Sequence, residues 1–435
     1  MSGTPPRRIA VVGASLAGLS TARALRAQGF AGELVVIGDE VHRPYDRPPL
    51  SKGFLGADHA SVDLSLEAEA EDLDARWHLG VCATALTPEP AGGATISLSD
   101  GTQETTDAVV VATGAAARCS VTGFDLPGVH RLRTLDDAIG LRADLHAAAA
   151  DGRTVAIVGG GFIGSEVAAT ARELGCQVTL IVAEDVPLRL ALGPYADAVA
   201  ALHAEHGVTV RPFAQVEAIE TGTTGLRVLI KDGEPVEAAT VVLGIGAIPS
   251  VGWLAGSGLD CGPNGRAAIR CDESGATDLP GVYAVGDCAA WFDSPRGRHH
   301  QIEHWTSAKE RGAVVAARIL GAEKLPTCRA PYVWSDLYGH RLQLAGYRDL
   351  ADHENTLEAT LEVGSPAEKT FSAVYRRGGE PVAVLSLDQA RHFNQIRRKL
   401  AVPVAAPVPA VAVPASAVVA DVPTAAVPAA QGVPA

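Results

Sequence analysis

The feature that most constrains the fold is a pattern that occurs twice. Residues 7–40, RRIAVVGASLAGLSTARALRAQGFAGELVVIGDE, and residues 152–185, GRTVAIVGGGFIGSEVAATARELGCQVTLIVAED, follow the same order. Each has an apolar strand, a glycine-rich turn, a helix with apolar residues at helical spacing, and a second strand that runs into acidic residues. The chain is therefore predicted to be an α/β protein with two nucleotide-binding units.

The glycines of the two turns have distinct tasks. In G-x-G-x-x-G the first glycine permits the tight turn, the second lets the backbone approach a pyrophosphate, and the third lets the helix pack on the strand. The helix N-terminus supplies N–H groups and a dipole for the negative charge. The second unit fills all three places, with Gly159, Gly161 and Gly164. In the first unit Ser15 stands between Gly13 and Gly18, and a serine is small enough for a pyrophosphate still to approach.

Two dinucleotide sites in one chain indicate a flavin and a nicotinamide, with a hydride passing between them. At the end of the second strand of the first unit, Asp39 or Glu40 is placed to hold an adenosine ribose. In the second unit the strand VTLIV ends in Val182, and the first carboxylate comes only at Glu184. Arg189 follows closely and is able to meet a 2′-phosphate. The sequence favours NADH, and NADPH stays an open alternative.

Composition excludes several other classes of protein. A chain of 435 residues is expected to form two or three domains. A net charge of −14 argues against a general nucleic-acid binder. The seven cysteines are scattered, which predicts free thiols in a reducing cytosol and no metal site. The start of the chain has no apolar signal region, and no apolar run is long enough to span a bilayer, so a soluble cytoplasmic protein is expected.

The texture of the chain changes near its end. From Pro331 short strand-like runs, YVWSDLYGHRLQLAGY and FSAVYRRGGEPVAVLSL, precede a helix expected around Asn394–Leu400, which predicts an α+β domain. After Ala401 almost every residue is Ala, Val or Pro. Such a segment cannot bury enough apolar surface to offset its ordering entropy, so a disordered tail is expected.

Several further motifs link these segments into a recognisable order. They include GASLAG, RPYDRPPLSK, VVVATGA, IVGGGFIGSEVAA, GIGAIP, VYAVGDCA, IEHWTSA, WSDLYGHRLQLAG and HFNQ. In them the chain, from residue 7 to about 400, resembles the FAD-dependent pyridine-nucleotide oxidoreductases and, within these, the ferredoxin reductases. The resemblance implies two Rossmann-like dinucleotide-binding domains, the NAD domain inserted in the FAD domain, plus a C-terminal α+β domain.

The resemblance also implies the boundaries of these domains. The expected segments are 1–115 (first part of the FAD domain), 116–245 (NAD(P) domain), 246–322 (second part of the FAD domain), 323–400 (C-terminal interface domain) and 401–435 (disordered tail).

Carried over residue by residue, the resemblance implies a set of cofactor contacts. Ser15, Leu16 and Ala17 would lie at the FAD pyrophosphate, Asp39 at the adenosine, and Ala83 would contact adenine through its backbone. Asp287 would accept hydrogen bonds from the ribitol hydroxyls, and Trp305 would pack beside the flavin ring. The remaining cofactor contacts implied for FAD are Gly13, Gly18, Arg47, Ala112, Thr113, Gly114, Arg133 and Gly286, and Gly246 is implied as a contact of one of the two cofactors. Those implied for the nicotinamide cofactor are Gly159, Gly161, Ile163, Gly164 and Glu184.

The family pattern gives Lys52 a partner. The lysine of PPLSK would face the isoalloxazine and pair with Glu166, on the helix that follows the second glycine turn. A buried ammonium beside a flavin needs an anion to offset its desolvation, and Glu166 would supply it. The resemblance thus implies that Lys52 and Glu166 form the catalytic pair.

A missing residue type bears on where the electrons go. Disulfide reductases of this superfamily carry cysteines on the first helix after the FAD-binding strand, and residues 41–60 contain none. We therefore expect electrons to leave one at a time for an external carrier. The resemblance makes that carrier a [2Fe–2S] ferredoxin.

An acidic ferredoxin requires positive charge near the flavin. Basic runs are present at Arg296–His300, at Lys309 and Arg311, and at Arg391–Lys399. As a group they are expected to steer the carrier to the flavin mouth and the C-terminal domain. His299 and His300 lack the neighbouring ligands of a metal site. One departure touches this prediction, because Leu337 follows WSD where relatives commonly have Gln, which leaves the partner surface open.

The predicted function is a ferredoxin reductase. Electrons would pass from NAD(P)H through FAD to a [2Fe–2S] ferredoxin that supplies a cytochrome P450 or a ring-hydroxylating oxygenase. Reduction of rubredoxin, nitrite or monodehydroascorbate on the same scaffold is an alternative. A second alternative is a non-catalytic, redox-sensing FAD protein resembling apoptosis-inducing factor.

Overall fold

The structure is a computed structural model that describes residues 6–57, 59–90, 92–223, 225–262, 267–347 and 357–400. The predicted disordered tail, residues 401–435, lies outside the described residues. None of the helices within the described ranges combines the length and the apolar character that a bilayer crossing requires.

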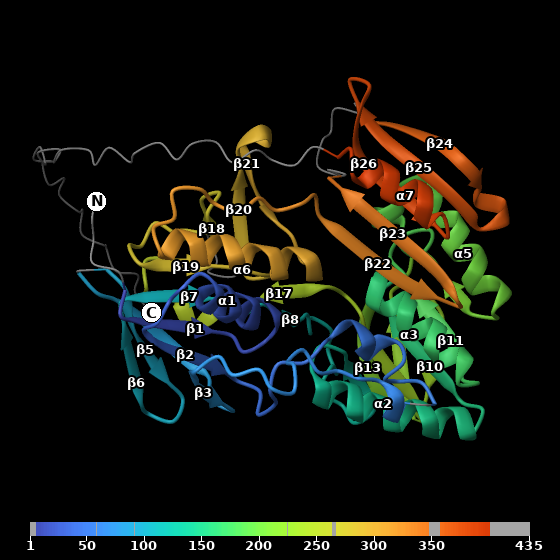
Figure 1. Ribbon diagram of the computed structural model, residues 1–435. Coiled ribbons are helices and arrows are strands. Elements are labelled where there is room, and N and C mark those ends of the chain that lie inside the picture. The colour runs from blue at the N-terminus through green and yellow to red at the C-terminus, as the bar shows by residue number, and fades with distance from the viewer. Residues whose placement is uncertain are drawn as a thin grey trace, which may run out of the picture. The chain divides into compact units, whose positions relative to one another are not determined.

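The first half of the duplicated pattern forms a parallel sheet with the strand order β19-β7-β1-β2-β3. Its strands are β1 (Arg8–Val12), β2 (Glu33–Gly38), β3 (Ala75–Leu79), β7 (Ala108–Val111) and β19 (Val282–Ala284). The helices packed beside it, α1 (Leu16–Ala27) and α6 (Trp305–Ile319), lie against each other (Figure 1). A strand from late in the chain thus completes the sheet that the N-terminus begins.

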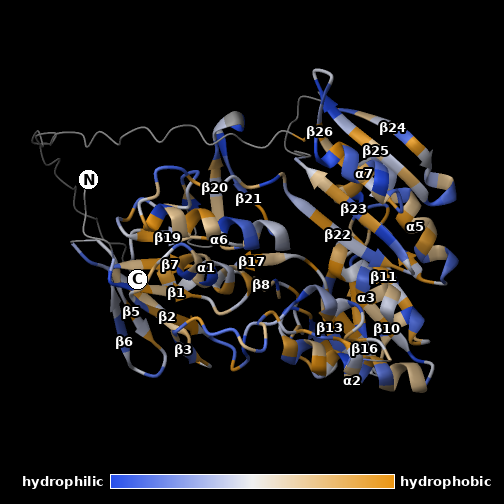
Figure 2. Ribbon diagram, viewed as in Figure 1, coloured by the Kyte–Doolittle hydropathy of each residue, from blue (hydrophilic) through white to orange (hydrophobic). Residues whose placement is uncertain are grey.

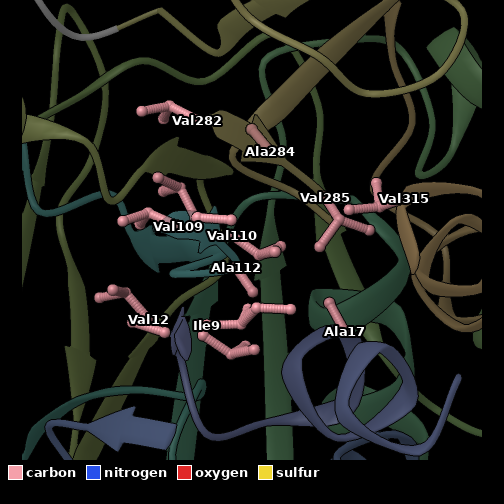
Figure 3. Close-up of a cluster of buried hydrophobic side chains, with 14 of the residues drawn as sticks. Ile9, Val12, Ala17, Val109, Val110, Ala112, Val282, Ala284, Val285 and Val315 are labelled. Atoms are coloured by element: carbon pink, nitrogen blue, oxygen red, sulfur yellow. The ribbon is translucent and has the colours of Figure 1, made fainter. Parts of the chain in front are cut away.

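The core of this sheet explains why its strands are continuous apolar runs. Every residue of β7 is buried, as are four of the five residues of β1, because both faces of the sheet are covered. Figure 3 shows Val12, Val110 and Ala284 from three strands close together, with Val315 of α6 on the helix side. The strands of both parallel sheets are coloured mainly at the hydrophobic end of the scale in Figure 2.

The second half of the pattern forms a second parallel sheet, with the order β12-β11-β10-β16-β9. Its strands are β9 (Val129–Arg131), β10 (Thr154–Val158), β11 (Gln177–Ile181), β12 (Thr209–Arg211) and β16 (Thr240–Leu243). Its helices are α2 (Leu135–Ala150), α3 (Phe162–Glu173), α4 (Arg189–Leu192) and α5 (Ala196–Glu205). The capping box of Thr134 and Asp137 starts α2, since each side chain accepts a backbone N–H of the other residue.

A short antiparallel ribbon marks the two crossings between the sheets. β8 (Ala115–Ala117) follows β7, and β17 (Ala247–Pro249) follows β16, and the two strands pair with each other. The chain therefore enters and leaves the second sheet side by side. The predicted domain boundaries at residues 115, 245 and 322 stay a prediction.

Smaller sheets accompany the parallel ones. The antiparallel sheets β4-β5-β6 and β13-β14-β15 and the mixed sheet β18-β20-β21 are inserted between the longer elements. Their strands are β4 (Ala83–Pro88), β5 (Ala94–Leu98), β6 (Gln103–Thr106), β13 (Val216–Thr221), β14 (Leu226–Ile230), β15 (Val236–Ala238), β18 (Ile269–Cys271), β20 (Ala289–Asp293) and β21 (Arg298–Gln301).

The C-terminal part is an antiparallel sheet with the order β22-β23-β26-β25-β24 and a helix, α7 (Ala390–Arg397). Its strands are β22 (Tyr332–Leu337), β23 (His340–Gly346), β24 (Glu358–Ser365), β25 (Thr370–Arg377) and β26 (Glu380–Leu387). The predicted fold class, two Rossmann-like units and a C-terminal α+β domain, is confirmed. The C-terminal helix begins four residues before the predicted Asn394, and strand β11 ends at Ile181, one residue before the predicted Val182.

Candidate functional site

The first glycine turn, between β1 and α1, is built around a close backbone contact. Gly13 has φ +123°, and a Cβ atom there would lie 2.1 Å from the carbonyl oxygen of Ala112. A Cβ atom on Gly18 would lie 1.8 Å from the carbonyl oxygen of Gly13, so helix and strand pack without a side chain between them. Only glycine fits these two places, as the motif predicts.

Ser15 is the N-cap residue that precedes α1, but its side chain does not cap the helix. Its hydroxyl accepts a hydrogen bond from Arg47 Nε at 3.2 Å and makes no capping bond to α1. The first turn of α1 carries no acidic residue. The N–H groups and positive dipole end of this helix are therefore free to receive an anion.

A cavity of about 570 Å³ opens at this turn. The volume lies in the range of pockets that hold cofactors. The predicted site residues that line it are Gly13, Ser15, Leu16, Ala17, Asp39, Arg47, Lys52, Ala83, Ala112, Thr113, Gly114, Arg133, Ile163, Glu166, Gly286, Asp287 and Trp305. The predicted residues that do not line it are Gly18, Gly159, Gly161, Gly164, Glu184 and Gly246. The structure thus gathers nearly all of the expected flavin contacts around one space.

At one end of the cavity, the two candidate acids after β2 have different surroundings. Glu40 pairs with Arg47, its Oε1 lying 2.6 Å from Nη2, and it also accepts the Tyr45 hydroxyl. Burial raises the pKa of Tyr45, so the hydroxyl keeps its proton and donates. Asp39 is exposed at the cavity, near Ala83 at the start of β4. Of the two alternatives, Asp39 is the carboxylate open to a ribose.

Further along the cavity an ion pair links two predicted residues. Arg133 Nη2 lies 2.8 Å from Asp287 Oδ2. Glu303 is solvent-exposed but lines the same space, where partial desolvation and the charge of Asp287 raise the pKa of its carboxyl group. Glu303 belongs to the quoted motif IEHWTSA, yet the sequence alone did not single it out.

Aromatic side chains line the cavity near α6. Trp305 is the first residue of α6, and its Nε1 donates to Asp46 Oδ1 at 2.7 Å. Trp334 of β22 meets it edge-on, with the ring centroids 6.2 Å apart, and Tyr332 stacks on Trp334 at 5.6 Å. These rings bring the C-terminal sheet to the same space as the first glycine turn.

The contact predicted between Lys52 and Glu166 is confirmed. Lys52 follows a 3-10 turn, η1 (Pro48–Ser51), whose prolines stand in its first turn, where their missing N–H groups cost nothing. Lys52 Nζ lies 2.8 Å from Glu166 Oε2 and 3.0 Å from the carbonyl oxygen of Pro48. Glu166, on α3, is 5% exposed. The pair is therefore largely shielded from water at the junction of the two halves of the pattern.

Two hydroxyl groups complete the surroundings of the Glu166 carboxylate. Ser51 donates to Oε2, and Ser335 of β22 donates to Oε1 at 2.6 Å. Thr170, one turn further along α3, donates to the carbonyl oxygen of Ser51 at 3.0 Å. Sequence reasoning missed both serines. The alternation of β22 was the available signal, because it puts a polar residue at an inward position.

The second glycine turn, between β10 and α3, has the same backbone form in different surroundings. A Cβ atom on Gly159 would lie 2.3 Å from the carbonyl oxygen of Gly244, and one on Gly164 would lie 2.0 Å from that of Gly159. At Gly161, which begins α3, the nearest atom is 4.0 Å away. The middle glycine therefore faces open space, as a place of ligand approach requires.

The residues beyond β11 bear on the nicotinamide cofactor. Val182 is fully buried, and a Cβ atom on Gly160 would lie 2.5 Å from its Cγ1. Glu184 is half-buried, and its carbonyl oxygen accepts the N–H of Phe213 at 3.0 Å. Arg189, the candidate for a 2′-phosphate, is held by Asp185 at 2.7 Å and Asp197 at 2.6 Å.

The basic residues predicted to steer a carrier do not all lie on the surface. Arg311 is 7% exposed and lies over the ring of Trp291, with its guanidinium carbon 4.6 Å from the ring centroid. The prediction that Arg311 belongs to an exposed basic group was therefore wrong. It sits on the face of α6 that is buried, with Ser307 and Val315 one turn away on either side. Burial lowers the pKa of its guanidinium. Leu337 is also buried, at 1% exposure, so its departure from the family pattern does not alter an exposed surface.

The other basic residues are distributed between ion pairs and solvent. Arg296 pairs with Asp293 at 2.6 Å and lies over the ring of Tyr347. Lys309 is exposed, with Nζ 5.1 Å from the centroid of Trp305. Around α7 the exposed basic residues are Arg391, Arg398 and Lys399. Within the described residues, no three His, Cys, Asp or Glu side chains gather as metal ligands would.

Comparison with known proteins gives two family matches. Residues 7–312 match the model of the pyridine nucleotide-disulphide oxidoreductases, and residues 332–418 match that of the reductase C-terminal domain. The chain is 35% identical over 414 residues to the ferredoxin–NAD(+) reductase subunit of a benzene 1,2-dioxygenase system from Pseudomonas putida, covering 90% of this chain and 91% of that protein. It is 36% identical over 398 residues to the ferredoxin reductase component of a chlorobenzene dioxygenase from Cupriavidus sp., covering 90% and 91%.

A solved structure has the same fold over nearly the whole chain. It is that of a covalent putidaredoxin reductase–putidaredoxin complex, with a TM-score of 0.80 and 31% identity. The match covers 91% of this chain and 93% of that one.

Proposed function

The chain belongs to the pyridine nucleotide-disulphide oxidoreductase family, and on this premise we propose that it passes electrons from NAD(P)H through FAD to a ferredoxin. The observation that carries the proposal is the cavity that begins at the first glycine turn and reaches Lys52 and Glu166. It offers a helix N-terminus for a pyrophosphate at one place and a buried ion pair at another. A pyrophosphate site and a buried charge pair in one cavity fit FAD.

The adenosine and ribitol parts of FAD have candidate ligands within the chain. Asp39, which is exposed at the cavity, would accept hydrogen bonds from the adenosine ribose hydroxyls, and the backbone of Ala83 would contact the adenine. Asp287 would accept hydrogen bonds from the ribitol, with Arg133 Nη2 holding that carboxylate at 2.8 Å. The family pattern and the presence of these residues in the cavity lining support these roles.

When bound, FAD would supply a hydride acceptor that can release electrons singly. Lys52 and Glu166 would hold a fixed charge pair beside the ring and set the local field there. Trp305, whose indole N–H is fixed on Asp46, would exclude water from the ring. Ile163, which is 40% exposed and lines the cavity, would meet the nicotinamide.

NADH is the cofactor that the surroundings of β11 favour. A 2′-phosphate would have to draw Arg189 away from Asp185 and Asp197, both of which lie within 2.7 Å of it. That exchange loses two charge-assisted contacts for each one gained. The relatives named for benzene and chlorobenzene oxidation include one designated a ferredoxin–NAD(+) reductase, which agrees with this choice.

The proposed acceptor is a [2Fe–2S] ferredoxin that supplies a ring-hydroxylating oxygenase or a cytochrome P450. Two relatives are components of dioxygenase systems, and the solved structure pairs a reductase with putidaredoxin. Residues 41–60 contain no cysteine that would take electrons through a disulfide. An acidic carrier would meet Lys309 near Trp305, and the exposed basic residues around α7.

The test is ferredoxin-dependent reduction of cytochrome c by the purified full-length protein. We expect turnover with NADH to exceed turnover with NADPH, and to require a [2Fe–2S] ferredoxin from a panel that also contains a rubredoxin. Turnover with rubredoxin and with no ferredoxin would show that the acceptor is a rubredoxin and not a [2Fe–2S] ferredoxin. A flavin that NADH reduces but that no carrier reoxidises would instead favour the redox-sensing alternative.

A further inference from the structure

The Glu166 carboxylate is held by groups from three distant parts of the chain. Lys52 and Ser51 lie in the connection between β2 and β3 of the first parallel sheet, Glu166 lies on α3 beside the second, and Ser335 lies on β22 of the C-terminal sheet. Its oxygens are divided between these partners. Oε2 takes Lys52 and Ser51, and Oε1 takes Ser335.

Ser335 contacts Glu166 without lining the cavity. It has no exposed surface and does not line the cavity, whereas its neighbour Trp334 does. Tyr332, Val333 and Trp334, the three residues before it in β22, all line the cavity. Ser335 follows them and reaches the Glu166 carboxylate, which also lines the cavity and pairs with Lys52.

We infer that Ser335 is a positioning residue, whose hydroxyl fixes the Glu166 carboxylate so that Oε2 stays on Lys52 Nζ. This inference rests on the proposed function, because the fixed charge pair matters through the hydride that arrives beside it. It gives the C-terminal sheet a second task besides contact with a partner, which is to set the geometry of the charge pair.

The physical argument follows from burial. A carboxylate that is 5% exposed must have both oxygens satisfied by donors, and a hydrogen bond to a charged group is among the stronger ones. If Ser335 becomes alanine, the buried Oε1 loses this donor. The carboxyl group then gains rotational freedom, and Lys52 loses the fixed direction of its partner.

The experiment compares Ser335→Ala with Ser372→Ala in the purified full-length protein. Ser372 lies in the same sheet, is equally buried, donates to the carbonyl oxygen of Leu385, and is hydrogen-bonded to His392 Nδ1 at 2.9 Å. Both variants lose buried hydrogen bonds, and only the bond of Ser335 involves Glu166. An equal loss of stability in the two variants therefore does not test whether Ser335 positions the Glu166 carboxylate. Three other measurements test it: the reactivity of Lys52, the rate of flavin reduction and the flavin absorption spectrum.

The first readout is the reactivity of Lys52 toward acetic anhydride, followed by mass spectrometry of the modified peptides. We expect S335A to react about fivefold faster than the parent protein and S372A to react at the parent rate. The second is the rate constant of flavin reduction by NADH at saturation. We expect it to fall roughly tenfold in S335A with little change in KM, since an oriented charge pair acts on the transition state.

A third readout is the flavin absorption spectrum, which should shift in S335A and not in S372A. Ser335→Thr should restore the parent values, because threonine keeps the hydroxyl. If S335A does not fold, Ser335→Cys takes its place, since a thiol of similar size is a weak donor, and the same changes are expected.

Equal Lys52 reactivity and equal flavin reduction in S335A, S372A and the parent protein would overturn the inference. This outcome is separate from failure of the proposed acceptor. A parent protein whose flavin is reduced by NADH but which reduces no ferredoxin would refute the acceptor and leave the test of Ser335 in place.

Discussion

Around the first glycine turn, between β1 and α1, the protein packs polar side chains closely, whereas around the second, between β10 and α3, it leaves the backbone open. Arg47 holds Ser15 at the first turn, and the cavity encloses the residues that follow. At the second, Gly161 has no atom closer than 4.0 Å to the place of a Cβ, and Ile163 is 40% exposed. The same type of glycine turn thus occurs once in enclosed and once in open surroundings. We expect the first turn to retain its cofactor and the second turn to exchange its cofactor.

The largest effect is expected from adding a methyl group at the first glycine turn. Gly13→Ala would place a Cβ atom 2.1 Å from the Ala112 carbonyl oxygen at φ +123°. We expect a loss of about 4 kcal/mol in the free energy of unfolding and loss of bound FAD. Urea denaturation and the flavin absorbance of the purified protein measure both. A stable variant that retains FAD would contradict the role given to this turn.

The next effect concerns the ion pair between the two turns. Lys52→Met removes one partner and leaves Glu166 buried, which should cost about 3 kcal/mol and slow flavin reduction strongly. The double variant Lys52→Met with Glu166→Gln should recover part of the stability but not the rate. Denaturation and stopped-flow measurements on both variants check this, and a double variant no more stable than the single one would argue against the pairing.

Acid should affect the second unit through a buried histidine. His203, on α5, is fully buried, its Nδ1 lies 2.9 Å from the Tyr338 hydroxyl, and burial lowers its pKa to about 4. The unfolded chain binds a proton near pH 6.5 and the folded chain does not, so stability is present above that pH and falls as the pH drops toward 4.

We expect this loss to reach about 2 kcal/mol. Urea denaturation between pH 4 and pH 7 measures it, and His203→Gln should flatten the slope. An unchanged slope in that variant would assign the acid sensitivity to other groups.

A smaller effect is expected where the second turn is open. Gly161→Ala adds a Cβ atom where nothing lies within 4 Å except the Gly244 oxygen at 4.0 Å, so the fold should be unaffected. The added methyl group meets the approaching pyrophosphate instead, and KM for NADH should rise about tenfold. FAD content should stay that of the parent protein. Loss of FAD, or an unchanged KM for NADH, would contradict the different roles given to the two turns.

The smallest effect concerns steering of the carrier. The double variant Arg398→Gln with Lys399→Gln should raise KM for ferredoxin roughly two- to threefold at low salt. It should leave this KM unchanged at high salt. The control is Arg227→Gln with Lys231→Gln, which removes the same charge from β14 and the residue after it. Equal effects of the two pairs would point to net charge rather than to a docking surface near α7.

The duplicated units and their order were predictable because strands buried on both faces leave continuous apolar runs, and because glycine turns have fixed spacing. The partnership of Lys52 and Glu166 came from a family pattern, since no local rule relates residues so far apart in the chain. Arg311 was assigned to the surface by its charge, although its helical spacing from Ser307 and Val315 placed it on the buried face.

Other features were not predictable from the sequence in practice. Strand β24 is an edge strand with mostly exposed residues, so it shows no apolar alternation to detect. Ser335 reads as an ordinary polar residue of a short strand. Its contact with Glu166 depends on how the C-terminal sheet packs on α3, which is a tertiary fact.

The ribbon formed by β8 and β17 has a consequence for the order of folding. β7 and β19 are neighbours in the first sheet, yet the whole second sheet lies between them in the chain. Closing so long a loop costs conformational entropy before any strand contact repays it. Because β8 and β17 pair where the chain enters and leaves, a second unit that has already folded shortens this loop to residues 112–114 and 250–281. The last strand of the first sheet can then dock at a lower entropic cost, so folding of the inserted unit should precede completion of the first parallel sheet.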